Sequence, residues 1–293
     1  MRKLFFIIII TGTSLYLYLF GFHRPKTLWT SKYRITDRKL NEVSGAVFSV
    51  KNPDLIWLHN DGRRLSGLFL TNRKGRTVKR FKSDVTLHDW EDIAIQIDKK
   101  GNSYLYAGDI GDNYRDRSCI QILKFNEPSL TDNQIEDSIS VRDTLFLRYP
   151  DGPRDAEAMF IDPVSNNLYI ISKREANPHI YGITLPEEAT DTLVLEKKGE
   201  LHIKGVKILG WVTAAAISSD GSQILLRTYS KVYYWTRLAG ETVEKAMTRE
   251  PFDLPHVKEL QGEAICFTPE SDGFYTVSEG KFPYLNYNQI KLK

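Results

Sequence analysis

The sequence predicts an all-β protein, and three observations lead to that class. Aromatic residues, which favour strands, make up 12% of the 293 residues. After residue 30, no stretch has the apolar spacing that is typical of an amphipathic helix. Instead, short β-branched and aromatic runs alternate with clusters of Asn, Asp, Gly and Pro, as expected of many short strands joined by turns.

A repeated phrase divides the chain into five units. Each unit opens with a small or acidic residue that is followed at once by an apolar strand. The opening residues, which lie 47, 66, 56 and 50 positions apart, are Ser44, Glu91, Glu157, Thr213 and Glu263. A second and a third strand follow each opening strand, as in NLYIISKRE at 167–175 and HIYGITL at 179–185. With a weaker fourth strand before the next unit, this period predicts the blades of a β-propeller.

The end of the chain indicates how many blades there are. The last unit stops after its third strand, whereas SKYRITD at 31–37 precedes the first unit and can supply the missing outer strand. Such a closure would join the two ends of the ring and protect open edges. Five blades are therefore predicted. Six blades are also compatible, because the 66-residue unit could hide extra strands in 126–150, and a β-sandwich or two separate β domains is the alternative architecture.

The N-terminus predicts a membrane anchor. Residues 4–22 carry no charge, and a run of 19 such residues is close to the ~20 that span a bilayer as a helix. The charged sequence HRPK follows this run, where a cleaved signal peptide would have small residues. We therefore expect an uncleaved anchor over 1–26 and a propeller domain over 27–293, outside the cytoplasm and attached to the membrane. A cleaved signal peptide is the alternative.

Composition argues against several other classes. The formal net charge of +3 is too small to indicate a nucleic-acid partner. Cys119 and Cys266 lie in apolar, strand-like runs, which is typical of buried thiols and not of a disulfide framework. The sequence has no G-x-S-x-G motif, no P-loop and no dinucleotide glycine fingerprint.

The opening residues of the five units are the predicted metal site. In a propeller the first strand of each blade lines the central channel, so these residues would form one ring; we call them the ring residues. Three carboxylates brought together repel each other, and a hard dication relieves that repulsion. Calcium binds 6–8 oxygen ligands, and the Ser44 and Thr213 hydroxyls suit the remaining positions. The alternative is that acids before strands only close turns, which is the interpretation we give to Asp89 and Asp155.

Polar residues at the ends of the second strands would surround this ring. Asp61 and Asp109 are the candidates for a catalytic base or a water-positioning group. Basic side chains there can bind phosphate or carboxylate. The predicted substrate-binding residues are Arg63, Lys173, Arg174 and Arg227.

With these motifs the chain resembles the calcium-dependent β-propeller hydrolases, and it is nearest in layout to the calcium-activated nucleotidase (apyrase) family. The order of the ring residues is similar to the alternation of Ser and Glu in that family, except that Thr213 stands where a serine is expected. LIWLHNDGRRLSGLFL at 55–70 looks like the family's acidic turn, and DWEDIAIQIDKKGNSYLYAGDIGDN at 89–113 resembles its next blade. The resemblance implies five blades, a central calcium ion and an Asp61 near the substrate. DAEAM resembles propeller phytases and lactonases more loosely.

The sequence therefore leads to two functional hypotheses. The first is a calcium-dependent hydrolase of a phosphorylated or carboxylic ester, acting on an anionic small molecule or a component of the cell envelope. The second is a non-catalytic module in which calcium is structural and the mouth of the propeller recognises a glycan, a peptide or an envelope partner.

Overall fold

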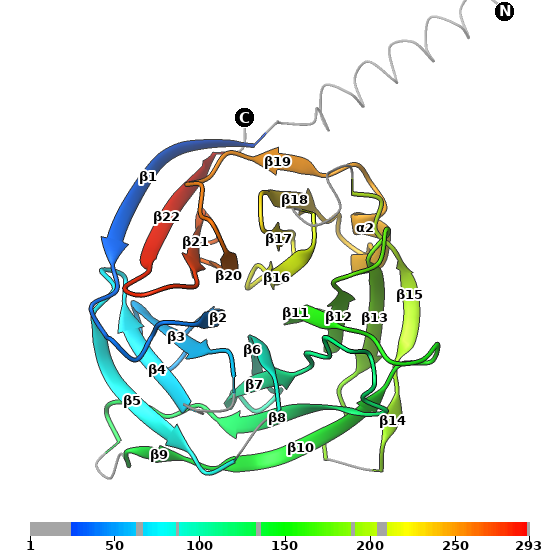
Figure 1. Ribbon diagram of the computed structural model, residues 1–293, viewed down its shortest axis with the longest axis horizontal. Coiled ribbons are helices and arrows are strands. Elements are labelled where there is room, and N and C mark those ends of the chain that lie inside the picture. Colours follow the sequence, from blue (N-terminus) through cyan, green and yellow to red (C-terminus); the bar gives the residue numbers. More distant parts are fainter. Residues whose placement is uncertain are drawn as a thin grey trace, which may run out of the picture.

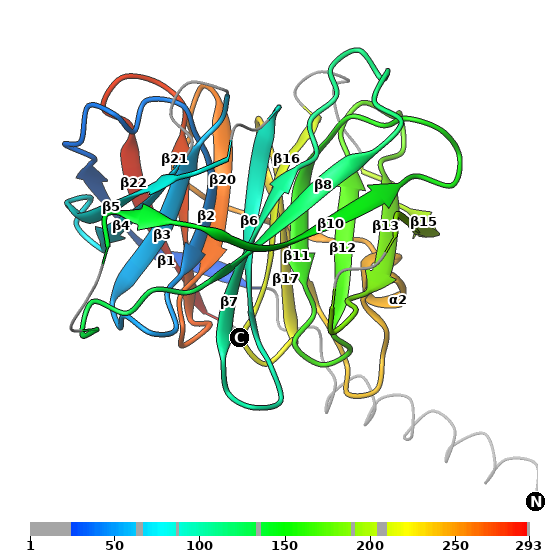
Figure 2. The ribbon, with the colours of Figure 1, turned by 90° about the horizontal axis from the view of Figure 1, so that it is seen from below.

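A computed structural model describes residues 25–62, 67–85, 88–132, 136–188, 191–203 and 210–291. Five sheets surround a central axis like blades (Figure 1), which confirms the five-bladed propeller and excludes the sandwich and the six-bladed ring. Seen from the side, the inner strands run along the axis, whereas the outer strands cross the wall at a steep angle to them (Figure 2).

Each blade has four antiparallel strands, which lie side by side from the axis outward. Blade 1 consists of β2 (Val43–Phe48), β3 (Leu55–Asn60), β4 (Gly67–Asn72) and β5 (Thr77–Ser83). Blade 2 consists of β6 (Trp90–Ile97), β7 (Ser103–Asp109), β8 (Ile120–Asn126) and β10 (Val141–Arg148). Blade 3 consists of β11 (Ala156–Ile161), β12 (Asn167–Ser172), β13 (His179–Thr184) and β15 (Glu196–Glu200). Blade 4 consists of β16 (Val212–Ile217), β17 (Gln223–Thr228), β18 (Val232–Thr236) and β19 (Phe252–Leu254).

Blade 5 combines the two ends of the chain, as the sequence predicts. Its strands are β20 (Gly262–Phe267), β21 (Gly273–Ser278), β22 (Tyr284–Lys291) and, outermost, β1 (Lys26–Arg34). β1 pairs antiparallel with β22, with Tyr33 opposite Leu285. The closing strand therefore begins at Lys26, earlier than the predicted segment 31–37 and at the last residue of the predicted membrane anchor.

Two short strands and one helix complete the wall. β9 (Ser138–Ile139) pairs in parallel with β5, and β14 (Leu193–Val194) pairs in parallel with β10. Each comes from the connection between the third and fourth strands of the following blade. The corresponding connection of blade 4 contains α2 (Val243–Met247) instead, capped by Thr242, whose side chain accepts a hydrogen bond from the Lys245 N–H.

The hydrophobic core is divided into five clusters, one between each pair of neighbouring blades. Inner strands are buried on both faces, and all six residues of β11 are buried. This explains why their sequences are continuous apolar runs. Outer strands such as β5 face solvent on one side, so their residues alternate and the sequence signal is weaker. Both cysteines are free, as predicted, but only Cys266 is buried and Cys119 is partly exposed.

The predicted membrane anchor and localisation require correction. No helix in the described part of the chain is long and apolar enough to cross a bilayer. β1 begins at Lys26, so the last residue of the predicted anchor belongs to the propeller. Residues 4–22, whose length and lack of charge suggested the anchor, lie outside the described residues. The prediction of a membrane-anchored domain outside the cytoplasm is therefore not retained.

Candidate functional site

The five ring residues occupy the same position in the five blades. Each is the second residue of an innermost strand, and at each one the pairing with the neighbouring strand shifts register. A β-bulge of this kind turns a side chain away from its regular direction and is frequent next to functional sites. All five residues are at most 6% exposed. The repeat in the sequence thus corresponds to a repeated structural irregularity around one end of the channel.

The two hydroxyl members of the ring connect neighbouring blades. Ser44 Oγ donates a hydrogen bond of 2.6 Å to the backbone oxygen of Glu91, and it lies 3.4 Å from Glu91 Oε2. Thr213 Oγ1 donates a hydrogen bond of 2.7 Å to the backbone oxygen of Gly262. Both hydroxyl protons are therefore used between blades.

The charge of Glu157 raises the pKa of the other two carboxylates of the ring. Burial and then the charge of Glu157 raise the pKa of Glu91 well above its usual value. The same two causes raise the pKa of Glu263 to about 9. Burial raises the pKa of Glu157 to about 7 against the opposing effect of Lys173, whose ammonium group forms an ion pair with it. Negative charge is thus concentrated where solvent cannot screen it well.

A tighter group of carboxylates lies beside the ring. Asp61, Asp89 and Glu91 each place a carboxylate oxygen within 4.8 Å of the others, and we call them the acidic trio. Asp61 follows β3, and Asp89 precedes β6. Asp61 Oδ1 is buried without a hydrogen-bond partner, and burial together with the charge of Asp89 raises the pKa of Asp61 to about 7. Within the described residues, no member of the trio forms a salt bridge.

Gly111 leaves the space that the trio requires. A Cβ atom at this position would lie 2.3 Å from Glu91 Oε1 and 2.4 Å from Asp89 Oδ2, which is closer than real atoms approach. Only glycine therefore allows the two carboxylates to occupy this space. An oxygen-only donor set, an unpartnered buried oxygen and a cradle without a side chain together fit a hard cation such as calcium.

Substitution of Gly111 by alanine should weaken calcium binding at least about tenfold, because the new methyl group would push Asp89 or Glu91 out of position. Calorimetric titration with calcium chloride measures the change. Gly199→Ala is the matched control, since nothing lies within 4 Å of a Cβ there and its backbone is not in the left-handed region. Equal calcium affinity in Gly111→Ala and the unaltered protein would show that the ion, if bound, lies elsewhere.

Asp109, a predicted catalytic base, holds the segment that carries Asp89. Its carboxylate accepts hydrogen bonds from the backbone N–H groups of His88, at 3.1 Å, and Asp89, at 3.0 Å. Arg117 Nη1 donates a third hydrogen bond to it, at 2.9 Å. The side chain is buried and its oxygens are occupied, so the geometry makes Asp109 a positioning residue for the trio.

Three of the four predicted substrate-binding residues already have acidic partners. Lys173 pairs with Glu157 and donates a hydrogen bond of 3.1 Å to the Tyr229 hydroxyl. Arg174 pairs with Asp155 and lies 4.5 Å from the Trp211 ring centroid.

Arg227 is 1% exposed and pairs with Glu259. It lies flat over Gly262, where a Cβ atom would be 1.7 Å from Nη2. The remaining predicted residue, Arg63, lies outside the described residues.

The structure reveals two site residues that the sequence reasoning missed. Asp89 was interpreted as a turn residue, yet it precedes Glu91 by two positions, and alternate residues of an extended chain point to the same face. That spacing could have identified it. Gly111 could not have been identified, because only the fold brings it against Asp89 and Glu91.

Asp92 closes the channel below the ring. Its side chain is fully buried, and Oδ1 accepts a hydrogen bond from the backbone N–H of its neighbour Ile93. Oδ2 accepts two more, from the backbone N–H groups of Met159, at 2.9 Å, and Ala215, at 3.3 Å. One side chain of blade 2 thus holds the inner strands of blades 3 and 4.

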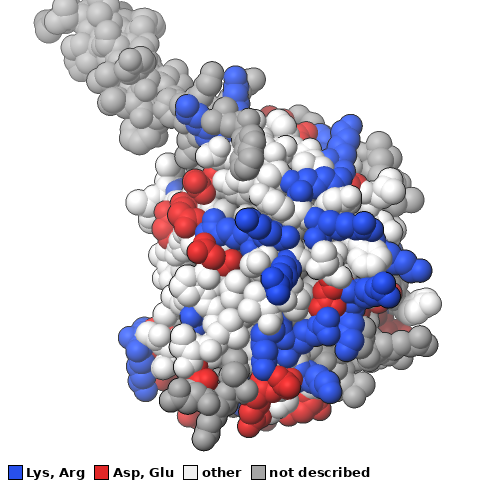
Figure 3. All heavy atoms as spheres, turned by 90° about the vertical axis from the view of Figure 1, so that its left-hand side faces the viewer, with Lys and Arg blue, Asp and Glu red and all other residues white. Residues whose placement is uncertain are grey.

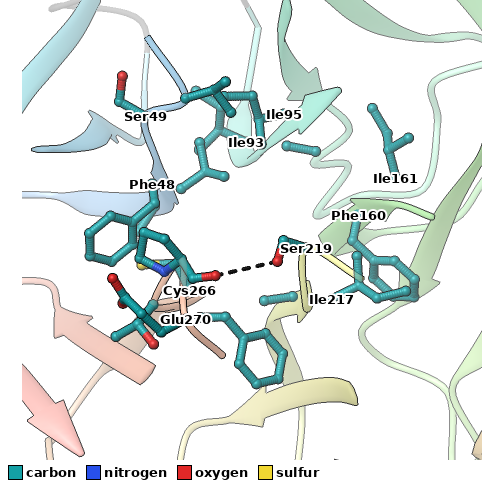
Figure 4. A pocket seen from close by; sticks show the side chains of 18 of the residues that line it. Phe48, Ser49, Ile93, Ile95, Phe160, Ile161, Ile217, Ser219, Cys266 and Glu270 are labelled. Atoms are coloured by element: carbon teal, nitrogen blue, oxygen red, sulfur yellow. Dashed lines mark hydrogen bonds between the residues drawn. The ribbon is translucent and has the colours of Figure 1, made fainter. Parts of the chain in front are cut away.

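The other end of the channel contains a mainly apolar cavity of about 500 Å³ (Figure 4). Phe48, Ile93, Phe160 and Ile217 are among the side chains that line it. Ionisable chemistry is therefore concentrated at the opposite end, at the acidic trio.

Comparison with known proteins adds little beyond the fold. No protein-family model matches the sequence, and no curated protein matches it. Among solved structures, the nidogen/laminin complex aligns over 82% of this chain and 73% of that chain, with 15% sequence identity and a TM-score of 0.42. This likeness concerns the fold alone. None of the comparisons supports the resemblance to apyrases, phytases or lactonases.

Proposed function

We propose that the acidic trio binds calcium at the mouth of the propeller, and that the protein is a calcium-dependent hydrolase of a phosphorylated or carboxylic ester. The observation that carries this proposal is the trio itself. Asp61, Asp89 and Glu91 place carboxylate oxygens within 4.8 Å of one another, beside a glycine that leaves room for two of them, and none forms a salt bridge with a described residue. Such an arrangement is costly unless a cation neutralises it.

The neighbouring residues suit hydrolysis. A calcium ion bound there would polarise a phosphoryl or carbonyl oxygen and lower the pKa of a bound water. Glu263 forms no salt bridge within the described part of the chain, and its pKa of about 9 lets it hold a proton at neutral pH. It can therefore donate that proton to a leaving oxygen. The bound cation itself would supply positive charge for an anionic substrate.

Calcium should stabilise the protein more at pH 8 than at pH 5. The pKa values of about 7 for Asp61 and about 9 for Glu263 exceed those of an unfolded chain. Above about pH 4 the calcium-free folded state therefore binds more protons than the unfolded state, and its stability falls as the pH rises through 7 toward 9. At pH 8, saturating calcium should raise the melting temperature by about 5–10 °C.

At pH 5 this shift should shrink to about a quarter or less, because protons compete with the ion for the same carboxylates. Tryptophan fluorescence during thermal unfolding, with calcium or with a chelator, measures both shifts. Magnesium at equal ionic strength is the control for nonspecific salt effects. A calcium shift of equal size at both pH values would contradict carboxylate binding.

Activity is tested with a panel of phosphate monoesters, phosphodiesters and carboxylic esters, assayed with calcium and with chelator. The proposal expects hydrolysis of at least one class, abolished by the chelator and restored by calcium. Calcium binding by titration calorimetry, without hydrolysis of any of the three classes, would leave the metal site standing and overturn the enzymatic part.

A non-catalytic binding module is the second candidate, and one observation favours it. Lys173, Arg174 and Arg227 all have acidic partners, so fewer positive charges remain for an anionic substrate than the sequence suggested. In that case calcium would hold the blades together, and the mouth would recognise a glycan, a peptide or an envelope partner. Calcium binding without turnover is the result expected of this candidate.

A further inference from the structure

The outer edge of β1 is open, as those of β15 and β19 are, whereas the outer edges of the two blades that follow it are extended. β1 is the last strand of its sheet and lies on the outside of the ring (Figure 1). The outer strands of the next two blades are each extended by one more parallel strand: β9 pairs with β5, and β14 pairs with β10. The fold therefore already adds parallel strands to the outer edges of its blades.

β1 cannot receive such a strand from the next blade. The corresponding connection runs from the end of β4 at Asn72 to the start of β5 at Thr77, which is too short to form one. This turn contacts the chain just beyond β1, where the Gly75 backbone oxygen accepts a hydrogen bond of 3.4 Å from the Thr36 N–H. Within the described residues, the outer edge of β1 has no strand partner. Such an edge presents backbone N–H and C=O groups that a strand from another chain can bind.

Basic side chains surround this edge. β1 and β5 together contain six basic residues and no acidic one, whereas β10, β15 and β19 each contain at least one acidic residue. Figure 3 shows Lys and Arg side chains gathered on this face of the molecule. Of the six, Lys79 and Arg80 form salt bridges, whereas Lys26, Lys32, Arg34 and Lys82 form none with a described residue. The turn between β4 and β5 adds Lys74 and Arg76, which also form no salt bridge with a described residue. Since the net charge of the chain is only +3, this is a local concentration of charge.

We propose that the outer edge of β1 binds an extended acidic peptide segment of a partner protein, which adds to the sheet as a further strand. Main-chain hydrogen bonds would provide affinity, and alternate acidic side chains would provide specificity. Lys32 and Arg34 are two residues apart, so they lie on one face of β1, about 7 Å apart along the strand. Acidic residues at every second position of the peptide would match that spacing.

Two other occupants fit this edge less well. A second copy of the chain would bring two basic edges together, and like charges on adjacent strands repel. Single-stranded nucleic acid binds such surfaces by stacking its bases on aromatic rings. On this face two rings already have a cation over them, because Lys32 Nζ lies 3.9 Å from the Tyr284 ring centroid and the Arg34 guanidinium lies 4.8 Å from that of Phe282.

The test uses the full-length protein and a fluorescent eight-residue peptide that alternates Glu and Val. Fluorescence anisotropy should show binding that weakens as salt rises. The same peptide with N-methyl groups on alternate backbone amides keeps its charges but cannot pair as a strand, and it should bind at least tenfold more weakly. Equal affinity of the two peptides would overturn strand addition.

Charge reversal tests the role of the basic residues. The double variant Lys32→Glu, Arg34→Glu should lose at least tenfold in affinity for the peptide, and Lys32→Gln, Arg34→Gln should lose less. Lys99→Glu, Lys100→Glu is the matched control on the exposed β6–β7 turn and should bind normally. Circular dichroism verifies that all three variants fold. Tighter binding of a heparin fragment or a DNA oligonucleotide than of the peptide, with the same loss in the charge-reversed variant, would overturn the assignment to a peptide.

Discussion

Substitution of Glu91 by glutamine is expected to lower calcium affinity at least about 100-fold, which corresponds to about 2.7 kcal/mol. Glu91 is the one residue that belongs both to the ring and to the acidic trio. The amide removes one of three negative charges and replaces an oxygen ligand by an NH₂ group, which cannot coordinate a cation. Glutamine has nearly the same volume, and the Ser44 hydroxyl would keep its hydrogen bond, because its acceptor is the Glu91 backbone oxygen.

Titration calorimetry on chelator-treated protein measures this loss. Glu196→Gln, a substitution on the outer strand β15, is the control and should leave calcium affinity unchanged, since Glu196 is exposed. Glu157→Gln should have a smaller effect than Glu91→Gln, because Glu157 lies outside the trio and pairs with Lys173. A larger effect of Glu157→Gln would show that the ion is centred on the ring and not on the trio.

Substitution of Asp92 by alanine is expected to destabilise the protein by about 3–5 kcal/mol. The change leaves the backbone N–H groups of Ile93, Met159 and Ala215 without their acceptor. A buried donor without a partner costs about 1–3 kcal/mol. Because the core is divided into five clusters between blades, a side chain that bonds to three blades has no substitute in the apolar packing.

Urea denaturation followed by tryptophan fluorescence measures the destabilisation. Asp98→Ala is the control; this residue accepts hydrogen bonds from the backbone of an exposed turn, at Lys100 and Asn102, and should cost only about 1 kcal/mol. The two variants should have the same denaturant slope as the original protein, which indicates an unchanged folded state. If Asp92→Ala were no less stable than Asp98→Ala, water would have to satisfy the freed N–H groups.

The sequence predicts the fold well because its period has a direct physical cause. Each inner strand packs between two blades, which requires an uninterrupted apolar run, and each turn requires polar residues or glycine. The five ring residues are therefore identifiable from their spacing, and the structure places all five at equivalent bulges. The N-terminal strand is also predictable, because an open fifth blade would expose an edge.

The site is predictable only in part, since a side chain's partner depends on contacts between blades. The sequence places Thr213 and Glu157 in one ring, but it does not show that the Thr213 hydroxyl bonds to Gly262 or that Lys173 pairs with Glu157. Likewise, Arg227 follows a strand as a substrate-binding residue would, yet it is buried over Gly262. Local sequence predicts where such residues lie along a strand, but not which side chains they contact.

The closure of blade 5 has a consequence for how the protein is made. β1 precedes all the other described strands, whereas β22, its partner, follows them all. During synthesis, blades 1 to 4 can form in turn from neighbouring segments, but β1 must wait until β22 has emerged from the ribosome. Throughout that interval it is an unpaired strand in a crowded cell. Its Lys26, Lys32 and Arg34 would then keep the nascent chain from aggregating, before they take any part in the finished protein.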